Sequence, residues 1–467
     1  MTQATERQDL IPRGQIVFDS LRAEDEPWLD ICFVPPLDFD LMNGTRSVLI
    51  FGDVGAGKTA LHYALRQHSL GRPGQPRRLP VAWEPEVSTD DYPASTDDLA
   101  VAQINSLFAA CALAVARYVA DAPETFALAP RWARTALADF VGAYGQFKPE
   151  VAARLLEEAG PAGEQSITEL LAVPAAGVTT RSAPERIAAR LVEALRSLGL
   201  TGIWVLADST GRELADQAPL VKAWQVFVST LPGLKLPQFT YKLIVDTELQ
   251  SKLLDTSGVE RGYLDGYPVR WDTPRLLTLV ERRLQLATGE PSMTLDKLAD
   301  KASLVRWLER TGGQSPREWL RQVRHVLTHY LAAGAQAPVS TATLKELRRQ
   351  YPPSLRIDTE RQEIIVGARR VAAATLPERG YDTFVYLYQR SRQSNLVSQA
   401  ELYYRGYLGL PSVPRVPTDE SYVAPKSYEG LMHTLLYRLR QQIEPDPSEP
   451  VLFETVKGRG VRLLRPW

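Results

Sequence analysis

The sequence predicts an α/β fold built on a parallel sheet, followed by an all-helical segment and a small C-terminal domain of helices and hairpins. Short apolar runs without alternation are typical of strands that are buried on both faces of a parallel sheet. From about residue 272 the apolar spacing is purely helical, and after residue 354 alternating runs, two helices and a final hairpin follow. The four predicted strands of the sheet are 47–51, 79–83, 203–207 and 241–245.

The composition agrees with a soluble chain of several domains. A length of 467 residues predicts two to four domains, and 44% hydrophobic with 23% charged residues is ordinary for globular proteins. The net charge of −1 excludes a global field that would draw the chain onto nucleic acid or a membrane. Because Cys32 and Cys111 are the only cysteines and the polar N-terminus has no signal-peptide core, we expect a cytoplasmic protein.

One long stretch, Leu99 to Ala116, carries no formal charge. It is rich in alanine and contains Gln103, Asn105 and Ser106, which favours a core helix of a soluble protein over a membrane-crossing helix. Its large apolar residues recur at helical spacing and predict one buried stripe. Residues 94–200 as a whole predict a large helical insertion between the second and third strands.

The run SVLIFGDVGAGKTALHYAL places a glycine-rich turn between the first strand and a helix start, and Gly52 to Thr59 fits G-x-x-x-x-G-K-[ST] without a gap. Glycines let backbone N–H groups wrap a phosphate, while the following helix directs the positive end of its dipole at the anion. We expect Lys58 to reach the β- and γ-phosphates and Thr59 to bind magnesium, so the sequence predicts a P-loop that binds ATP and Mg²⁺. The residues predicted to bind nucleotide here are Gly52, Asp53, Val54, Gly55, Ala56, Gly57, Lys58, Thr59 and Ala60.

A second acidic strand, GIWVLADST, resembles the Walker B strand of P-loop NTPases, and Asp208 at its end is the predicted magnesium aspartate. Ser209 stands where a catalytic glutamate commonly follows in active AAA+ ATPases. Two other carboxylates are candidates for the catalytic base. One is Asp208 itself, and the other is Glu84 at the end of the second strand, where some recombinase-like ATPases place it. Since the usual base is missing, we expect slow hydrolysis.

The helical segment contains GGQSPREWLRQVRHVL, Gly312 to Leu327, which resembles the start of the lid helix in AAA+ and STAND ATPases. Ser315 and Pro316 also fit an N-cap followed by a first-turn proline. The resemblance extends over about residues 20–335. It implies a signal-transduction ATPase in which Arg317 senses the phosphates and copies of the chain associate when ATP binds.

The C-terminal run LLYRLRQQIEPDPSEPVLFETVKGRGVRLL closely resembles the winged helix of two-component response regulators. In that family a recognition helix ending in L-R-x-K-I-E-P-D-P precedes a hairpin that reads T-V-R-G-x-G-Y-R-L. The resemblance implies a helix in the major groove of double-stranded DNA and a wing whose tip reaches the minor groove or the backbone. Leu435 replaces a family histidine and the segment is only weakly basic, which leaves open a winged helix that contacts protein instead. The residues predicted to contact DNA are Lys426, His433, Tyr437, Arg438, Arg440, Lys457 and Arg459.

These resemblances imply a bacterial regulatory or defence protein. The first interpretation is an ATP-binding, slowly hydrolysing conformational switch that couples nucleotide state to a DNA-binding winged helix. Two alternatives remain: an assembly protein whose winged helix binds protein partners, and a DNA-stimulated AAA+ ATPase. The predicted domains are a P-loop NTPase domain at 1–255, a helical lid at 256–335, a linker helix at 336–353 and a winged-helix domain at 354–467.

Overall fold

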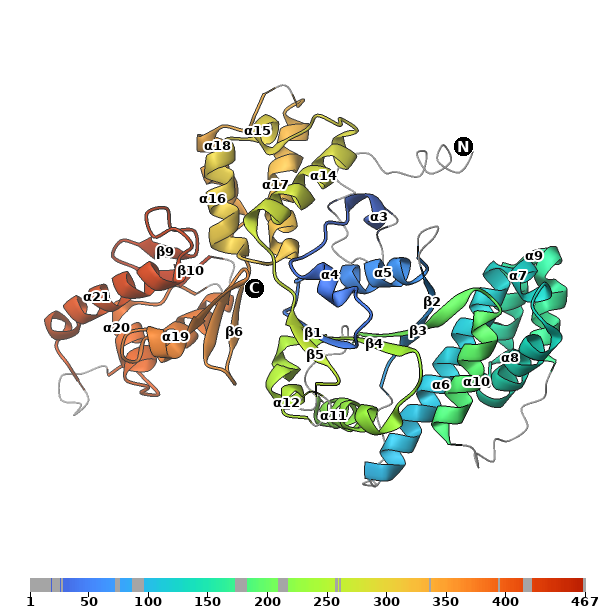
Figure 1. Ribbon diagram of the computed structural model, residues 1–467. Helices are drawn as coiled ribbons and strands as arrows, with labels where there is room; N and C mark the ends of the chain where they lie inside the picture. Colours follow the sequence, from blue (N-terminus) through green and yellow to red (C-terminus); the bar gives the residue numbers. More distant parts are fainter. Residues whose placement is uncertain are drawn as a thin grey trace. The chain divides into compact units, whose positions relative to one another are not determined.

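The computed structural model describes residues 18, 26, 28–71, 76–85, 96–172, 183–208, 217–256, 259, 262–335, 337–393, 395–414 and 422–464. The chain forms two compact units. The sheet unit is Pro35–Arg270, and the terminal unit combines Met1–Val34 with Trp271–Trp467, so both ends of the chain belong to it. Figure 1 labels the elements of each unit.

The sheet unit is built on five parallel strands in the order β2-β3-β4-β1-β5. Four of them contain the apolar runs that the sequence predicts as strands, which confirms the α/β prediction. The register places Gly52 of β1 opposite Asp246 of β4, and Asp208 of β3 opposite Ile244 of β4. The strands are β1 (Val48–Gly52), β2 (Arg77–Trp83), β3 (Leu200–Asp208), β4 (Phe239–Asp246) and β5 (Asp265–Pro268).

The fifth strand, β5, is absent from the prediction. Its four residues, Asp-Gly-Tyr-Pro, contain no apolar run, and an edge strand tolerates glycine and proline because one side needs no hydrogen-bonded partner. β5 pairs with β1 along Val48–Phe51 and so belongs to the sheet. The domain boundary predicted at residue 255 therefore falls before the last strand, and the compact units divide at Arg270.

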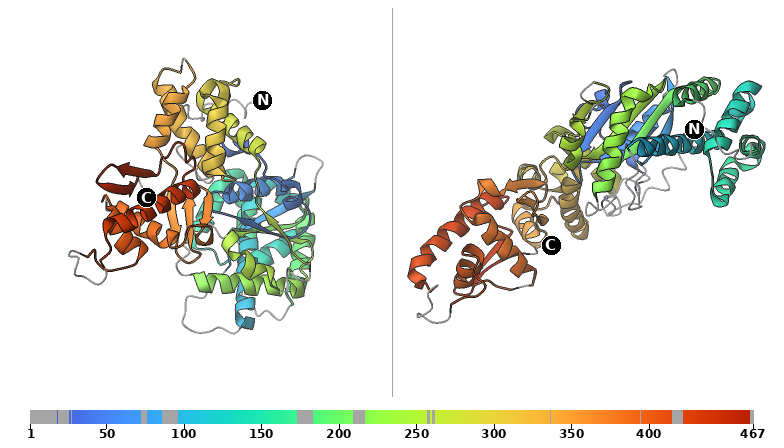
Figure 2. Two further views of the ribbon diagram at one scale, coloured as in Figure 1. Left: turned by 90° about the vertical axis from the view of Figure 1, so that its left-hand side faces the viewer. Right: turned by 90° about the horizontal axis from the view of Figure 1, so that it is seen from below.

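Helices cover both faces of the sheet, with α5 (Lys58–Ser69) on one side and α11 (Gln217–Leu234) on the other (Figure 1). The helices of the insertion gather beside the β2 edge (Figure 2), and they account for the helical stretch predicted at 94–200. The insertion consists of α6 (Thr96–Asp121), α7 (Pro123–Ala127), α8 (Arg131–Tyr144), α9 (Pro149–Leu171) and α10 (Pro184–Arg196). The remaining elements of the unit are α4 (Phe39–Met42), η3 (Thr247–Leu249) and α12 (Gln250–Leu254).

Helix α6 contains the uncharged stretch. Among the described residues it is the one helix long and apolar enough to cross a membrane, and 44% of its apolar window is buried inside the protein. Leu107, Phe108, Cys111 and Val115 of the predicted stripe are buried in the core of the sheet unit, where they pack with strand residues such as Leu243. The stripe therefore serves as the core side of an insertion helix.

The charged side chain of Lys242, on β4, is fully buried on the α5 face of the sheet. Its ammonium donates hydrogen bonds to the carbonyl oxygens of Gly44, at 2.7 Å, and of Arg46, at 2.8 Å. It also lies 4.8 Å from the centre of the Trp204 ring, a favourable cation–π distance. Burial, with a smaller contribution from the charge of Arg78, lowers the pKa of Lys242 to about 7.

In the terminal unit, Glu26 and residues 28–34 pack on the helical bundle after residue 271. Their anchor is a buried ion pair in which the Arg283 guanidinium of α14 donates to both carboxylate oxygens of Glu26, at 3.0 and 2.5 Å. Such a bidentate pair satisfies both charges inside the protein. The helices are α3 (Leu29–Cys32), α14 (Thr273–Thr288), α15 (Leu295–Leu298), α16 (Lys301–Gly312), α17 (Pro316–Ala332) and α18 (Thr341–Gln350).

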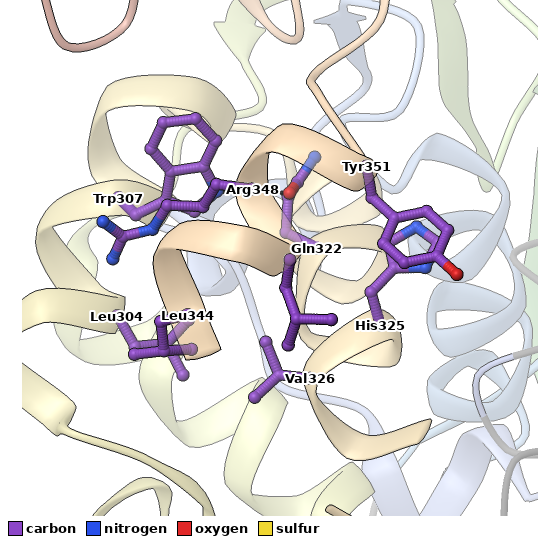
Figure 3. Close-up of a pocket in the computed structure, with 9 residues that line it drawn as sticks. Leu304, Trp307, Gln322, His325, Val326, Leu344, Arg348 and Tyr351 are labelled. Atoms are coloured by element: carbon purple, nitrogen blue, oxygen red, sulfur yellow. Dashed lines mark hydrogen bonds between the residues drawn. The ribbon is translucent and has the colours of Figure 1, made fainter. Parts of the chain in front are cut away.

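Helices α16, α17 and α18 enclose a small pocket, shown in Figure 3. The indole N–H of Trp307 donates to Gln322 at 3.2 Å, and the Arg348 guanidinium lies 5.1 Å from the Trp307 ring. The rings of His325 and Tyr351 stack at 3.9 Å. Burial, assisted by neighbouring arginines, lowers the pKa of His325 to about 4, so this ring stays neutral at physiological pH.

The C-terminal region, residues 355–464, has its own hydrophobic core and contains the predicted succession of strands, helices and a final hairpin. The first three strands form an antiparallel sheet in the order β6-β7-β8, and β9 pairs with β10. The strands are β6 (Leu355–Asp358), β7 (Glu363–Val366), β8 (Arg369–Ala372), β9 (Phe453–Val456) and β10 (Gly460–Leu463). The helical elements are η4 (Ala373–Thr375), α19 (Gly380–Arg392), α20 (Gln399–Glu401), the π-helical turn η5 (Leu402–Tyr407) and α21 (Pro425–Ile443).

Candidate functional site

The glycine-rich turn joins the carboxyl end of β1 to the first turn of α5. Gly55 and Gly57 adopt φ angles of 86° and 89°, a left-handed backbone that favours glycine. A side chain at Gly52 would place its Cβ only 2.9 Å from Lys58 Cγ, so the close approach of this lysine also requires glycine. The turn therefore has the backbone geometry that the motif predicts, at a helix N-terminus suited to an anion.

Lys58 is buried, with 5% of its side chain exposed. Its Nζ donates to Asp246 Oδ1 at 2.5 Å, to the carbonyl oxygen of Gly52 at 2.8 Å and to that of Asp53 at 3.2 Å. An ammonium group has three N–H donors, and all three are used here. The lysine is thus held inside the turn by two backbone carbonyls and one carboxylate.

Asp246 is the site residue that the sequence prediction misses. It ends β4 directly beside the end of β1, because β4 is the neighbour of β1 in the sheet. The run YKLIVDTEL has the same apolar-strand-then-aspartate pattern that singles out Asp208. Strand order decides which of these carboxylates meets Lys58, and a single sequence does not reveal strand order.

Asp208 and Asp246 lie on the same face of the sheet as α5. Asp208 pairs in register with Ile244, two residues before Asp246, so the two carboxylates share a face by the two-residue period of a strand. On α5, His62 forms a hydrogen bond with the carbonyl oxygen of Leu206. Burial lowers the pKa of His62, and the nearby Asp208 carboxylate opposes this shift.

The position of His62 also places Thr59. The two residues are three positions apart on α5 and so lie on one side of the helix, the side that faces the end of β3. Thr59 and Asp208 therefore suit a magnesium ion whose remaining ligands would be phosphate oxygens and water. In the described ranges there is no group of three or more His, Cys, Asp or Glu side chains that could hold a metal ion without such help.

Glu84, the other candidate base, follows β2 and is exposed. Because β3 and β4 separate β2 from β1, three strand spacings, or about 14 Å, lie between the ends of β2 and β1. Asp208 and Asp246 are both nearer to the turn. Ser209, which replaces the usual glutamate, lies outside the described residues.

Arg317 is exposed in the first turn of α17. The turn before it has the predicted cap, since the Ser315 hydroxyl accepts the Glu318 N–H at 3.4 Å and Pro316 occupies the first turn. Arg317 belongs to the terminal unit. Its role as a phosphate sensor stays a prediction.

The predicted DNA-contact residues divide into two groups in the structure. Six of the seven have exposed side chains, on α21 or at the turn between β9 and β10. The seventh, Arg440, is partly buried, donates a hydrogen bond to the Thr455 hydroxyl and lies 5.7 Å from the Phe453 ring. Arg440 therefore ties α21 to β9. The exposed six are Lys426, His433, Tyr437, Arg438, Lys457 and Arg459.

Glu444, directly after α21, explains part of the E-P-D-P motif. Its fully buried carboxylate accepts the backbone N–H groups of Val451, Leu452 and Phe453 at 3.0, 2.9 and 2.8 Å. Burial raises its pKa, although these hydrogen bonds act in the opposite direction. A glutamate at this position fixes the loop that joins α21 to the final hairpin.

Gly460 is required by a close approach. Its φ angle is 141°, and a Cβ there would lie 2.2 Å from the carbonyl oxygen of Val397. Val397 pairs with Val461 through two hydrogen bonds of 2.9 Å. The second glycine of the predicted wing thus allows the hairpin to pair with the segment before α20.

The helical bundle and the C-terminal region are joined by several contacts within the terminal unit. Arg310 of α16 pairs with Asp446, and Lys345 of α18 pairs with Glu449 at 2.6 Å. The carbonyl oxygen of Thr311 accepts the Ala368 N–H at 3.0 Å. Trp307 of α16 belongs to the hydrophobic core of the C-terminal region. The loop after α21 is therefore fixed to the bundle by ion pairs.

Comparisons with known proteins give no family. No protein-family model matches the chain, and no curated protein matches it in sequence. Among solved structures, the chain is similar to the Aeropyrum pernix ORC2 protein in its ADPNP–ADP complexes, with 13% identity and a TM-score of 0.36 over 96% of this chain and 93% of that one. A likeness of this size carries no argument about nucleotide, partner or activity. The description of the sheet unit as an α/β P-loop-like fold rests on its own topology.

Proposed function

We propose that this protein is an ATP-dependent conformational switch whose output is DNA binding by the C-terminal region. The observation that carries the proposal is the grouping of a phosphate-wrapping turn, Lys58, Thr59 and Asp208 at the carboxyl edge of one parallel sheet. These groups supply the anion site, the point charge and the magnesium ligands that a nucleoside triphosphate needs.

The output part of the proposal rests on the exposed side chains of α21 and the β9–β10 turn. Lys426, Arg438, Lys457 and Arg459 would pair with DNA phosphates, while His433 and Tyr437 would face base edges or sugars. A helix with its apolar side on a core and its polar side exposed is the arrangement expected of a winged-helix reader of the major groove. We therefore assign the winged-helix role to residues 355–464.

The coupling part rests on the contacts inside the terminal unit. Because α16 and α18 hold the loop after α21 through Arg310 and Lys345, a movement of the bundle carries the proposed DNA-reading helix with it. In this proposal ATP and ADP differ in how Arg317 and the bundle grip the nucleotide, and that difference sets the position of α21. Association of copies on ATP binding stays a prediction from the AAA+ resemblance.

Slow hydrolysis is part of the proposal. Asp208 and the serine at 209 leave no glutamate directly beside the magnesium position, and Glu84 follows the far edge strand. A poorly oriented attacking water lowers turnover by about a hundredfold or more. The bound triphosphate then lasts long enough to hold one conformation.

The alternative, a C-terminal region that binds protein, is favoured by one observation. Leu431 and Tyr437 of α21 are 42% and 63% exposed, although both are large and apolar or aromatic. Aromatic side chains of this kind are common at protein interfaces. Failure of the full-length protein to bind any duplex DNA at low salt, with or without ATP, would favour this alternative.

The nucleotide site is tested by calorimetric titration of the full chain with ATP in Mg²⁺, for wild type, Lys58→Ala and the control Lys222→Ala. Lys222 is an exposed lysine on α11 of the same unit. We expect Lys58→Ala to weaken ATP binding at least a hundredfold, because it removes the point charge on the phosphates, and Lys222→Ala to bind as wild type does. Melting temperatures without nucleotide report whether each variant folds. Equal ATP affinity in Lys58→Ala and wild type would contradict the P-loop assignment.

A further inference from the structure

We infer that Asp246 sets the nucleotide preference of the P-loop site: it competes with phosphate for Lys58 and makes triphosphate binding depend on magnesium. The inference rests on the proposed function, since it concerns the same site. It starts from the ion pair between Lys58 Nζ and Asp246 Oδ1, at 2.5 Å, which is largely buried, with 5% and 17% of the two side chains exposed.

The three acceptors of Lys58 are not equally free to leave. The carbonyl oxygens of Gly52 and Asp53 are held by the β1–β4 register and by the turn, in which the Ala56 N–H bonds to the same Asp53 oxygen at 3.0 Å. The Asp246 carboxylate is on a side chain and can rotate about its own χ angles. A phosphate oxygen that binds Lys58 therefore takes the place of Asp246.

The exchange leaves two negative groups close together. In the described parts of the chain, Lys58 is the one cation that forms an ion pair with Asp246. Once phosphate takes Lys58, the carboxylate is left facing the phosphates at the largely buried carboxyl edge of the sheet, where like charges repel more strongly than in water. The repulsion is largest for a triphosphate, because its γ-phosphate adds negative charge next to Lys58.

Magnesium relieves this repulsion. A cation bound by Thr59, Asp208 and the phosphates would lie on the same sheet face as Asp246 and offset the added negative charge. Asp246 therefore penalises ATP without magnesium most, ATP with magnesium less, and ADP least. Asp246 therefore changes the ratio of ATP to ADP affinity, in addition to any effect on the affinity for both.

The test uses Asp246→Asn, which keeps the size and the hydrogen-bond acceptor but removes the charge. Calorimetric titrations of the full chain with ATP and with ADP are carried out in EDTA and in Mg²⁺. Asp265→Asn is the matched control. Asp265 also lies at a strand end and forms an ion pair, with Arg46 at 3.1 Å, but it lies at the amino ends of the strands, away from the glycine-rich turn.

We expect Asp246→Asn to bind ATP in EDTA at least tenfold more tightly than wild type, a change of about 1.4 kcal/mol. The gain for ADP is expected to be threefold or less, and the effect of Mg²⁺ on ATP affinity to shrink. Asp265→Asn is expected to match wild type throughout. Asp246→Ser, which also removes the charge, gives the same readout if the asparagine variant does not fold.

Two results overturn the inference. An unchanged ATP-to-ADP affinity ratio in both Asp246 variants shows that the carboxylate does not choose between nucleotides. Weaker binding of both nucleotides shows that Asp246 supports the site instead of competing for Lys58. In either case the proposed function still holds if wild type binds ATP and Lys58→Ala does not. If wild type binds no nucleotide, both the proposed function and this inference are wrong.

Discussion

Positively charged side chains are buried at the carboxyl edge of the sheet and exposed on the outer side of the C-terminal region. At the sheet edge, Lys58 is buried and all of its donors are satisfied by groups of the protein itself. On the C-terminal region, Arg438 and Arg459 are exposed. The lysine of the first region is bonded inside the protein, while the second region presents its charges to solvent.

The difference teaches which residues of each region are structural. In the C-terminal region, Arg440 and Glu444 face inward and hold α21, the hairpin and the connecting loop together. At the sheet edge, by contrast, Lys58 and Asp246 hold the turn together and also belong to the proposed nucleotide site. Substitutions therefore separate folding from binding in the C-terminal region more cleanly than at the sheet edge.

The largest expected effect concerns hydrolysis at the sheet edge. We expect Asp208→Asn to lower phosphate release by about a hundredfold, because it removes the proposed magnesium ligand or base, and Glu84→Gln to change it by less than twofold. Wild-type turnover is expected to lie well below about 10 per second. A steady-state phosphate-release assay measures all three. If Glu84→Gln loses turnover and Asp208→Asn keeps it, the catalytic base is Glu84, after β2.

The next effect sharpens the division within the C-terminal region. We expect Arg438→Ala and Arg459→Ala each to weaken binding of duplex DNA by the full chain about three- to tenfold, and to lower the slope of log affinity against log salt by about one. Arg440→Ala is the contrast, because its partners are Thr455 and Phe453. It is expected to lower the melting temperature and to leave the salt slope unchanged. Fluorescence anisotropy at several salt concentrations measures these slopes. Equal slopes in all three variants would contradict the division into DNA-contacting and structural arginines.

A further expected effect, on stability instead of turnover or binding, concerns the buried side chain of Lys242. Its pKa is about 7 in the folded protein against an ordinary 10.5, so between these values the unfolded chain binds more protons than the folded one. The free energy of unfolding is therefore expected to rise with pH from about 7 upward, by up to about 1.4 kcal/mol per pH unit, and to lose this contribution as pH falls to 7. Urea unfolding at pH 7, 8 and 9 measures the slope.

Lys242→Met is the variant that isolates this term, and Lys222→Met is its exposed control. We expect the methionine at 242 to flatten the pH dependence and the methionine at 222 to keep it. The same slope in Lys242→Met as in wild type would show that another group is responsible.

Much of the sheet unit is predictable from the sequence, because its strands are apolar runs and its turn is set by glycines at fixed spacing. Gly52 and Lys58 are identified from the motif, and the structure places Gly52 at the end of β1 and Lys58 at the start of α5. The strand β5 and the role of Asp246 are not predictable in this way. The first has no apolar pattern, and the second depends on which strands are neighbours.

In the C-terminal region the sequence predicts the succession of elements but not the direction of each charged side chain. Arg438 and Arg440 are two residues apart on α21, about 200° around the helix, so at most one of them lies on the outer side. The spacing of Leu431, Leu435 and Leu439 predicts the core side of the helix. Leu435 and Leu439 are buried there, whereas Leu431, one turn earlier, is 42% exposed. Whether Arg440 then reaches solvent or β9 depends on the position of the hairpin, which only the tertiary structure supplies.

The ion pair between Glu26 and Arg283 has a consequence for the order in which the chain assembles during synthesis. Its two residues are 257 positions apart, and the whole sheet unit, Pro35–Arg270, is made between them. At about 5–20 residues per second, a ribosome needs on the order of 10 to 50 s to supply the partner of Glu26. The sheet unit can complete its core within that interval. The ion pair closes only after Arg283 has emerged, so Glu26 reaches its native partner after the whole sheet unit has been made.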